Sequence, residues 1–364
     1  MEIKKLNKNW FLKKISILLV AGIAWGIILI TIFLKNTDNS GNIYKELISN
    51  DNIPEDNAIY YWKTTFQLNE YEKQFLHAHN IHKIYMRMFD VDYGEDNDGT
   101  VRSIPIATTR FLDTIPAGIE IVPTVYITTK AIRKNSEFAS LLYNRVQAMV
   151  KQNKLENIKE IQVDCDWTKD SQSEFFSFCK ALRNYAVEDG IKISATIRLH
   201  QLRKDVPPVD KGVLMLYNTG SVYSSDTKNS ILSYKDVEPY LCTEVNYPLP
   251  LDYAFPAYEW SILFRGNQFH SILRTTDFRN TDHYKKWKDN KYEVIKATDL
   301  EKIWLWKRDI IYVETSSLEE ILKVKKLVRS KIKQHSYHSI IYHLDGKNLS
   351  KYTQQEIDLI YKND

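Results

Sequence analysis

The stretch that decides the fold is EIQVDCDWT, residues 160–168. It places two carboxylates, Asp164 and Asp166, one residue apart at the end of an apolar run that is typical of a β-strand. Side chains alternate between the two faces of a strand, so both aspartates are expected on one face, together with Gln162. The other face is apolar and is expected to pack against helices; it consists of Ile161, Val163 and Cys165.

Short runs of this kind recur along the chain, separated by longer amphipathic stretches. They predict eight strands, over residues 59–66, 83–90, 120–128, 160–166, 192–198, 212–218, 251–258 and 339–345. Apolar residues at intervals of three and four predict helices over residues 70–79, 136–151, 171–189, 232–241 and 318–333. Strands that alternate with helices in this number predict an α/β fold, the (β/α)8 TIM barrel. A doubly wound open sheet is the alternative.

One segment departs from this alternation. Residues 260–313 lie between the seventh strand and the next helix, and they contain FRGNQFHSILR at 264–274. The pair Gly266-Asn267 is typical of a tight hairpin turn. We therefore expect a β-hairpin elaboration after the seventh strand.

The N-terminus has the pattern of a membrane anchor. Residues 15–34 form an uncharged, predominantly apolar run that is long enough to cross a bilayer as a helix. Five lysines and one glutamate precede it, which predicts that residues 1–14 stay in the cytoplasm. We expect a single-pass protein of the inner (cytoplasmic) membrane, with a linker over 35–57 and an extracytoplasmic domain over 58–364. A cleaved signal peptide is the alternative, with Gly22-Ile23-Ala24 as its small-residue site.

Composition argues against several classes of partner. The formal net charge is +4, but residues 1–35 hold six lysines and one acid, so the remaining chain is close to neutral and no nucleic-acid partner is expected. None of the 11 glycines belongs to a phosphate-binding loop. Three cysteines without a CxxC spacing predict no disulfide framework, no metal site and no cofactor, although one disulfide bridge remains open.

The same alternation of faces places polar side chains from several strands at the carboxyl-terminal rim of the barrel, where barrel enzymes carry their chemistry. Residues expected to face the interior or its rim are Arg87, Asp90, Asp92, Ser194, Thr196, Arg198, Ile341, His343 and Asp345. Arg87 is expected to share its face with Tyr85 and Phe89. On the last strand, the residues expected to face outward are Ile340, Tyr342 and Leu344.

Buried charges need partners, so Arg87 and Arg198 are expected to pair with acids such as Asp164 and Asp345. A salt-bridge network without chemistry is the alternative. Aromatic residues also fall at or beside strand ends, and they are Trp62, Trp167, Tyr217, Tyr258 and Trp260. Such rings can stack on sugar faces, and paired carboxylates suit glycosidic hydrolysis, although each ring could instead be packing.

Several motifs together resemble an uncharacterised bacterial envelope family of glycoside-hydrolase-like TIM barrels, over roughly residues 58–361. They are YYWKTTF (60–66), FDVDY (89–93), VDCDWT (163–168), YPLPLDYAFPAYEW (247–260) and YHLDGKNLS (342–350). The fourth-strand aspartates are also distantly similar to the acidic motif of chitinase-like barrels. That resemblance implies a proton-donating glutamate two residues after the last aspartate, where this chain has Thr168. The acid would have to come from elsewhere, with Asp345, Asp92 and Glu259 as candidates.

The leading hypothesis is a membrane-anchored, extracytoplasmic glycoside-hydrolase-like protein that acts on envelope or environmental polysaccharide. Its catalytic residues would be Asp164, Asp166 and Asp345, with Asp166 as acid or base. The substrate would be bound by Arg87, Asp90, Asp92, Trp167, Arg198, Tyr217, Asn218, Glu259, Trp260 and His343. The alternative is a catalytically inactive barrel that binds carbohydrate or serves as a structural component of the envelope.

Overall fold

The computed structural model describes residues 57–95, 99–132, 137–156, 158–333 and 337–362. Eight parallel strands form a closed barrel, because β1 pairs with β3 on one side and with the last strand, β18, on the other. In order around the ring they are β1 (Asn57–Tyr61), β3 (Ile81–Glu95), β6 (Glu120–Ile127), β7 (Glu160–Asp164), β8 (Lys192–Ile197), β9 (Lys211–Met215), β10 (Leu251–Pro256) and β18 (Ser339–Tyr342). The closed ring confirms the predicted barrel and excludes the open sheet.

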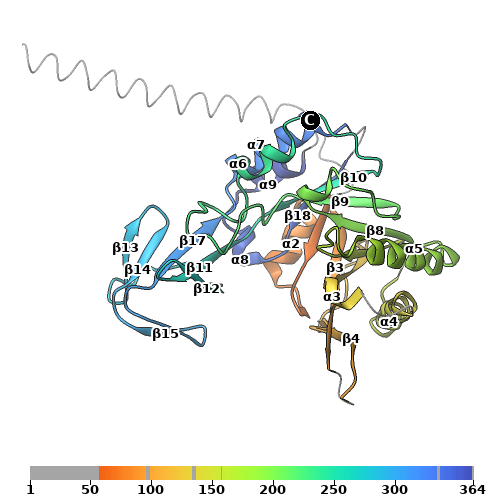
Figure 1. Ribbon diagram of the computed structural model, residues 1–364, viewed down its shortest axis with the longest axis horizontal. Coiled ribbons are helices and arrows are strands. Elements are labelled where there is room, and N and C mark those ends of the chain that lie inside the picture. Colours follow the sequence, from red (N-terminus) through yellow and green to blue (C-terminus); the bar gives the residue numbers. More distant parts are fainter. Residues whose placement is uncertain (1–56, 96–98, 133–136, 157, 334–336, 363–364) are drawn as a thin grey trace, which may run out of the picture. The chain divides into compact units, whose positions relative to one another are not determined.

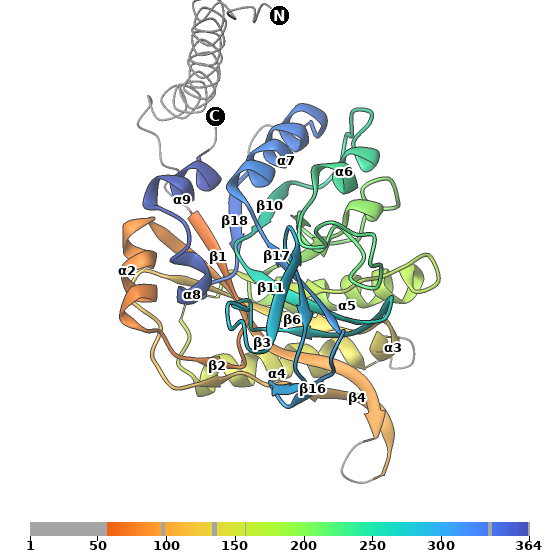
Figure 2. The same ribbon diagram turned by 90° about the vertical axis from the view of Figure 1, so that its left-hand side faces the viewer.

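Helices surround the ring of strands (Figure 2). They are α2 (Glu70–Ala78), α3 (Thr129–Ile132), α4 (Phe138–Gln152), α5 (Gln172–Glu188), η1 (Leu199–Gln201), α6 (Tyr234–Val237), η2 (Glu238–Tyr240), α7 (Leu318–Lys331), α8 (Gly346–Leu349) and α9 (Gln354–Tyr361). Four of the five predicted helices are found nearly in full. The fifth is divided into α6 and η2, which contains Pro239, a residue that lacks the amide hydrogen a continuous helix would use.

The insertion after β10 is larger than the predicted hairpin (Figure 1). It contains β11 (Glu259–Arg265), β12 (Gln268–Leu273), β13 (Tyr284–Lys288), β14 (Lys291–Val294), β15 (Thr298–Leu300), β16 (Ile303–Leu305) and β17 (Ile310–Thr315). Five of these strands form an antiparallel sheet in the order β12-β11-β17-β14-β13, and β15 pairs with β16. The expected turn between β11 and β12 is confirmed, with Gly266 at φ +60°. The sheet buries its own cluster of Leu263, Leu273, Phe278, Tyr284, Val294, Leu305 and Ile311.

The link after the second barrel strand also contains more structure than predicted. The long strand β3 continues beyond the barrel and pairs with β4 (Val101–Ile106), while β2 (Thr65–Phe66) pairs with β5 (Arg110–Phe111). The register of β3 on β6 shifts between Arg87 and Phe89. This shift corrects the expectation that both share a face: the Phe89 ring meets the Arg145 guanidinium of α4 at 4.9 Å, outside the ring.

The apolar face of β7 packs on α5 as expected. Cys165 is buried, and the ring of Trp167 lies 6.2 Å from Phe175 and 5.3 Å from Phe176 of that helix. The three cysteines are free thiols, so no disulfide forms among them. Trp167 was expected to bind substrate; the alternation of faces along β7 places it in the outer core instead, which corrects that expectation.

The predicted membrane helix, residues 15–34, lies outside the described residues, as do residues 1–14 and nearly all of the linker. Among the residues that are described, no helix is both long enough and apolar enough to cross a bilayer. The anchor therefore stays a prediction from sequence.

Candidate functional site

Two hydrogen bonds across the barrel interior fix the direction of the β7 side chains. The Tyr60 hydroxyl donates to Gln162 Oε1 at 2.7 Å, and the Thr196 hydroxyl donates to Asp164 Oδ1 at 2.6 Å. These contacts come from β1 and β8, which lie on different sides of β7 in the ring. The expected inward face of β7 is thereby confirmed.

Asp166 lies one step further out and is bound by Arg198. The Arg198 Nε donates to Asp166 Oδ1 in an ion pair, and the Asp166 side chain remains 49% exposed. Arg198 was expected to neutralise Asp164 or Asp345. Its direct partner is Asp166 instead, because both side chains extend past the ends of their strands.

The pKa of Asp164 is raised, first because of burial and also because of the neighbouring Asp166 charge, against the opposing effects of Arg198 and Thr196. Burial lowers the pKa of Arg198, but Asp164 and Asp166 outweigh it, so the guanidinium stays charged. Burial, with the charges of both aspartates, raises the pKa of Tyr126 to about 12. The pair therefore consists of a buried carboxyl that favours its proton and a carboxylate held by arginine.

A second ion pair stands on β3. The Arg87 guanidinium binds Asp90, with Nε to Oδ1 at 2.8 Å, and lies 5.7 Å from the centre of the Trp62 ring. The expected pairing of Arg87 with Asp164 or Asp345 is therefore wrong; the register shift in β3 brings Asp90 beside it. Asp92 accepts from the Thr128 hydroxyl at 2.7 Å, and this bond is the main reason that its pKa is lowered.

The ring of Tyr342 lies inside the barrel, which corrects the expected faces of the last strand. It stacks on Tyr217 at 4.4 Å and lies 5.6 Å from Tyr60, 5.9 Å from Trp62 and 5.8 Å from Tyr258. The expectation continued a strict alternation through residue 345 and so put Ile341, His343 and Asp345 inside. Aromatic rings fill the interior instead, and β18 ends at Tyr342.

Two of the three residues of this segment that were expected inside, His343 and Asp345, lie between the barrel and α2. Asp345 caps α8 by accepting from the Asn348 amide at 3.0 Å. It also pairs with Lys63 at 3.2 Å, and the same lysine binds Glu72 of α2. Burial raises the pKa of Asp345, but Lys63 and the bond from the Asn348 amide outweigh burial, so the pKa is lowered. Burial lowers the pKa of His343. Neither residue joins Asp164, so both expectations are wrong.

Aromatic residues continue the site from the barrel toward the insertion. The Tyr258 hydroxyl donates to Asn218 Oδ1 at 2.6 Å, and its ring lies 5.4 Å from that of Trp260. The Trp260 Nε1 donates to the buried Glu314 at 3.0 Å. Tyr217, Asn218 and Trp260 are thus placed together as expected. We use "barrel mouth" for Trp62, Arg87, Asp166, Arg198, Tyr217, Tyr258, Trp260 and Tyr342.

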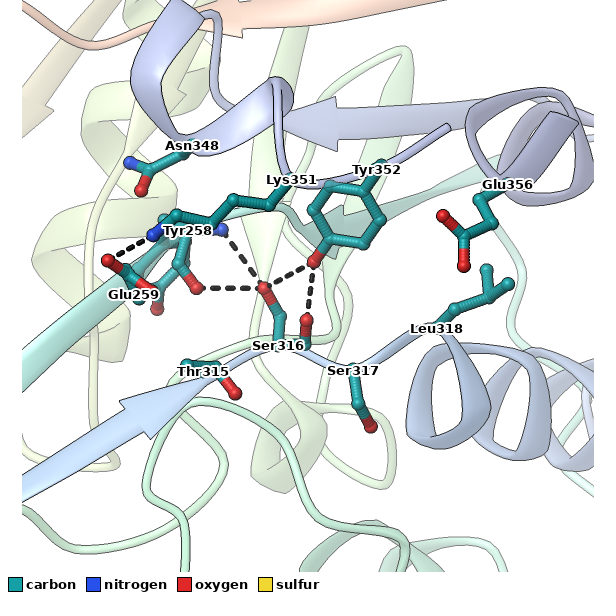
Figure 3. Close-up of a pocket in the computed structure, with 10 residues that line it drawn as sticks. All are labelled: Tyr258, Glu259, Thr315, Ser316, Ser317, Leu318, Asn348, Lys351, Tyr352 and Glu356. Atoms are coloured by element: carbon teal, nitrogen blue, oxygen red, sulfur yellow. Dashed lines mark hydrogen bonds and ion pairs between the residues drawn. The ribbon is translucent and has the colours of Figure 1, made fainter. Parts of the chain in front are cut away.

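Glu259 lines a cavity of about 280 Å³, together with Tyr258 and residues that lead into α7, α8 and α9 (Figure 3). It forms an ion pair with Lys351 and accepts from the Thr276 hydroxyl. The lining consists of Tyr258, Glu259, Thr315, Ser316, Ser317, Leu318, Asn348, Lys351, Tyr352 and Glu356. Ser316 and Tyr352 hydrogen bond to each other within it, at 2.9 Å. Glu259 is therefore engaged by a lysine and does not face Asp164 and Asp166.

Three tyrosines of the interior were missed from the sequence, or assigned to the wrong face: Tyr60, Tyr126 and Tyr342. Tyr60 stacks on Tyr85 at 5.0 Å. The hydroxyls of Tyr85 and Tyr217 and the amide nitrogen of Gln162 are buried without a hydrogen-bond partner among the described residues. The alternation of Tyr60 and Trp62 in YYWKTTF was the signal that could have identified an aromatic inner face on β1.

No protein-family model matches this chain, and a search of curated proteins found no match. Solved structures to which it is similar include the spore cortex-lytic enzyme SleL of Bacillus megaterium, with 11% identity and a TM-score of 0.49 over 85% of this chain and 74% of that one. A group IV chitinase of Ostrinia furnacalis has 10% identity and a TM-score of 0.49 over 84% and 98% of the two chains. A chitinase of Chromobacterium violaceum has 10% identity and a TM-score of 0.45 over 84% and 98%.

The expected resemblance to chitinase-like barrels thus has counterparts among solved structures. At these identities it concerns the fold, so the roles of residues rest on the geometry of the site. Among the described residues, no three His, Cys, Asp or Glu side chains are grouped so that they could hold a metal ion.

Proposed function

We propose that this chain is a membrane-anchored, extracytoplasmic barrel that binds polysaccharide at the barrel mouth without hydrolysing it. The observation that carries the proposal is the run of aromatic rings, Trp62, Tyr342, Tyr217, Tyr258 and Trp260, beside the partly exposed ion pair of Asp166 and Arg198.

Aromatic rings and charged groups together suit sugars. The apolar face of a sugar ring can stack on an aromatic side chain, while its hydroxyls bond to carboxylates and guanidinium groups. Deeper in the barrel, the buried hydroxyls of Tyr85 and Tyr217 and the Gln162 amide nitrogen have no hydrogen-bond partner within the part of the chain that the structure describes. A buried polar atom gains free energy from a hydrogen bond, so these atoms favour a hydroxyl-rich ligand or water over an apolar one.

The arrangement argues against hydrolysis because the position that holds the acid in chitinase-like barrels, and two of the acids expected to replace it, are unsuited to donate a proton. Thr168 is exposed, and its amide donates to the Ser171 hydroxyl. Of the alternative acids, Asp92 and Asp345 have lowered pKa values, the first through its bond from Thr128 and the second through Lys63. A general acid needs a raised pKa to hold its proton at neutral pH.

Glycosidic hydrolysis is the second candidate function, and one observation favours it. The pKa of Asp164 is raised by burial while its neighbour Asp166 stays beside Arg198, and two carboxyls with unlike environments are the usual arrangement of an acid and a base. In this case Asp164 would keep a proton and Asp166 would act as base or nucleophile.

A titration of the full chain with a panel of neutral and acidic oligosaccharides tests the proposal, with reducing ends assayed in the same samples. We expect saturable binding and no release of reducing ends. Arg198→Gln should weaken binding, since it removes the charge that holds Asp166. Release of reducing ends that Asp166→Asn abolishes, with the fold retained, would favour the second candidate.

The anchor is supported by the apolar run of residues 15–34 and the lysines before it. We expect the full chain to stay in the membrane fraction after alkaline extraction, and the barrel to be cut by a protease added from outside. Release of the barrel by alkali would favour the cleaved signal peptide.

A further inference from the structure

The insertion displays tryptophans on its surface. Among the described residues, three tryptophans are more than a third exposed: Trp287 at 60%, Trp304 at 49% and Trp306 at 54%. All three lie in the insertion, on or next to β13 and β16, and these hairpins lie at the end of the insertion away from the barrel (Figure 1). Large exposed aromatic side chains are typical of surfaces that contact a partner.

The backbone under Trp304 and Trp306 is held by one ion pair. Arg265 of β11 binds the buried Asp309 through two bonds, of 3.1 and 2.9 Å, and also donates to the Trp304 carbonyl at 3.0 Å. Asp309 accepts from the Trp306 amide at 2.8 Å and donates its own amide to the Trp306 carbonyl. A single ion pair thus holds the backbone of both tryptophans.

A second contact fixes the tip of the same hairpin. The Glu301 carboxylate, in the turn between β15 and β16, accepts from the backbone amides of Arg274 and Thr275 at 3.1 and 2.6 Å. The rings of Trp304 and Trp306 lie 6.1 Å apart at 79° to each other. The two rings are therefore presented in a fixed relation, which lowers the entropic cost of binding a ligand.

Positive charge surrounds the rings. Residues 284–308 contain eight lysines and arginines against four acids, although the chain beyond residue 35 is close to neutral overall. Lys302, Lys307 and Arg308 are exposed next to the two tryptophans in sequence. The charge of Glu301 is already engaged by backbone amides. The surface is therefore complementary to an anion.

We propose that Lys302, Trp304, Trp306, Lys307 and Arg308, here called the distal patch, bind an acidic polysaccharide, one that carries carboxylate, phosphate or sulfate groups. About half of each indole is covered, which leaves surface for stacking on a sugar ring. The cations bind the acidic groups. An anionic bilayer is the other partner that such a surface could meet, but two fixed, half-covered rings offer little side chain to insert. The distal patch does not depend on the barrel mouth.

Binding of the full chain to three soluble probes tests the proposal: polygalacturonate for carboxylate, heparin for sulfate and polyphosphate for phosphate. Uncharged dextran and phosphatidylglycerol vesicles complete the set. We expect at least one acidic probe that contains sugar rings to bind, with an affinity that falls as salt rises, and dextran to bind weakly. Trp304→Ala combined with Trp306→Ala should weaken binding about tenfold, and so should Lys307→Gln combined with Arg308→Gln.

Tyr240→Ala and Lys326→Gln are matched controls, since both remove an exposed side chain of the same kind outside the insertion. Circular dichroism checks that each variant is folded. The variants of the distal patch should leave the binding of neutral oligosaccharides at the barrel mouth unchanged, which separates this proposal from the function of the barrel mouth. Equal loss in the controls, binding of vesicles or polyphosphate alone, or no effect of the tryptophan variants would each overturn it.

Discussion

The two ends of the barrel both hold charged side chains inside the ring of strands, but they differ in what surrounds those charges. At the amino-terminal end, Lys83 lies 3.3 Å from Glu120 and 3.8 Å from Glu160, and Lys211 pairs with Asp252. The side chains of Glu160 and Asp252 are only 8% and 6% exposed. This network has partners for its charges and little contact with solvent.

At the carboxyl-terminal end, the Asp166 side chain is 49% exposed, and the barrel mouth combines the ion pairs of Arg198 and Arg87 with aromatic rings such as those of Tyr217 and Tyr342. The difference teaches that charge inside a barrel is not by itself evidence of a binding site. Partial exposure and aromatic neighbours are what distinguish the barrel mouth from the network at the other end.

The largest effect is expected from a substitution in the amino-terminal network. Asp252→Asn removes the charge that pairs with Lys211 and leaves that lysine largely buried, which should cost about 3–5 kcal/mol of the free energy of unfolding. Urea unfolding measures it. The exposed pair of Lys323 and Glu319 on α7 is the control, and Lys323→Gln should leave stability unchanged.

The pH dependence of this network has a defined sign. Burial raises the pKa of Asp252, but bonds from His338 and Lys211 outweigh it, so the folded pKa lies below the ordinary value. The contribution of Asp252 to stability is therefore full at pH values above its pKa in the unfolded chain. It is lost as the pH falls through its pKa in the folded protein. An Asp252→Asn variant that is as stable as the wild type at neutral pH would contradict the role of this network.

At the barrel mouth, the expected effect is on binding. Trp62→Ala removes a ring that lies 5.9 Å from Tyr342 and 5.7 Å from the Arg87 guanidinium. Oligosaccharide affinity should fall roughly tenfold, about 1.4 kcal/mol, with a smaller effect on stability. Calorimetric titration measures it, and Tyr240→Ala is the control. A tenfold loss in the control as well would mean that the sugar binds elsewhere.

A third prediction concerns the corrected position of Asp345. Because this side chain caps α8 and pairs with Lys63, Asp345→Ala should lower the free energy of unfolding by about 1 kcal/mol. It should leave oligosaccharide affinity unchanged, because Asp345 faces α2 and not the interior. A loss of binding with intact stability would restore Asp345 to the site.

The smallest effect is expected from Asp164→Asn. It is the same change of residue type as Asp252→Asn, made at the carboxyl-terminal end of the barrel. Burial raises the pKa of Asp164, so its contribution to stability is full at low pH and is lost as pH rises through the folded pKa. Asp164→Asn keeps an acceptor for Thr196 and should leave stability at pH 7 unchanged or raise it by up to about 1 kcal/mol. A large destabilisation at pH 7 would show that the two ends are alike.

The sequence was sufficient to predict the elements whose side chains follow a simple period. All eight strands and the inward direction of Asp164, Thr196 and Arg198 follow from alternation along single strands. The faces were wrong where that alternation is interrupted: at the register shift that turns Phe89 outward, and at the end of β18, where the last acid caps a helix.

Pairing across the barrel and within the insertion could not be predicted in this way. Arg87 binds Asp90, three residues away in the same strand, although acids on distant strands appeared equally suitable from sequence. In the insertion, β11 pairs with β17 across 44 residues of intervening chain (266–309), so its sheet is determined by contacts between segments that are distant in the sequence. Trp167 shows the opposite case: the period of two along β7 already placed it outward.

The most direct test of the central claim is one titration of the folded full chain with the oligosaccharide panel, in which bound ligand and new reducing ends are measured in the same samples over time. We predict saturable binding that Trp62→Ala and Arg198→Gln both weaken, with no increase in reducing ends. Reducing ends that accumulate in proportion to enzyme concentration and disappear in Asp166→Asn would contradict the account.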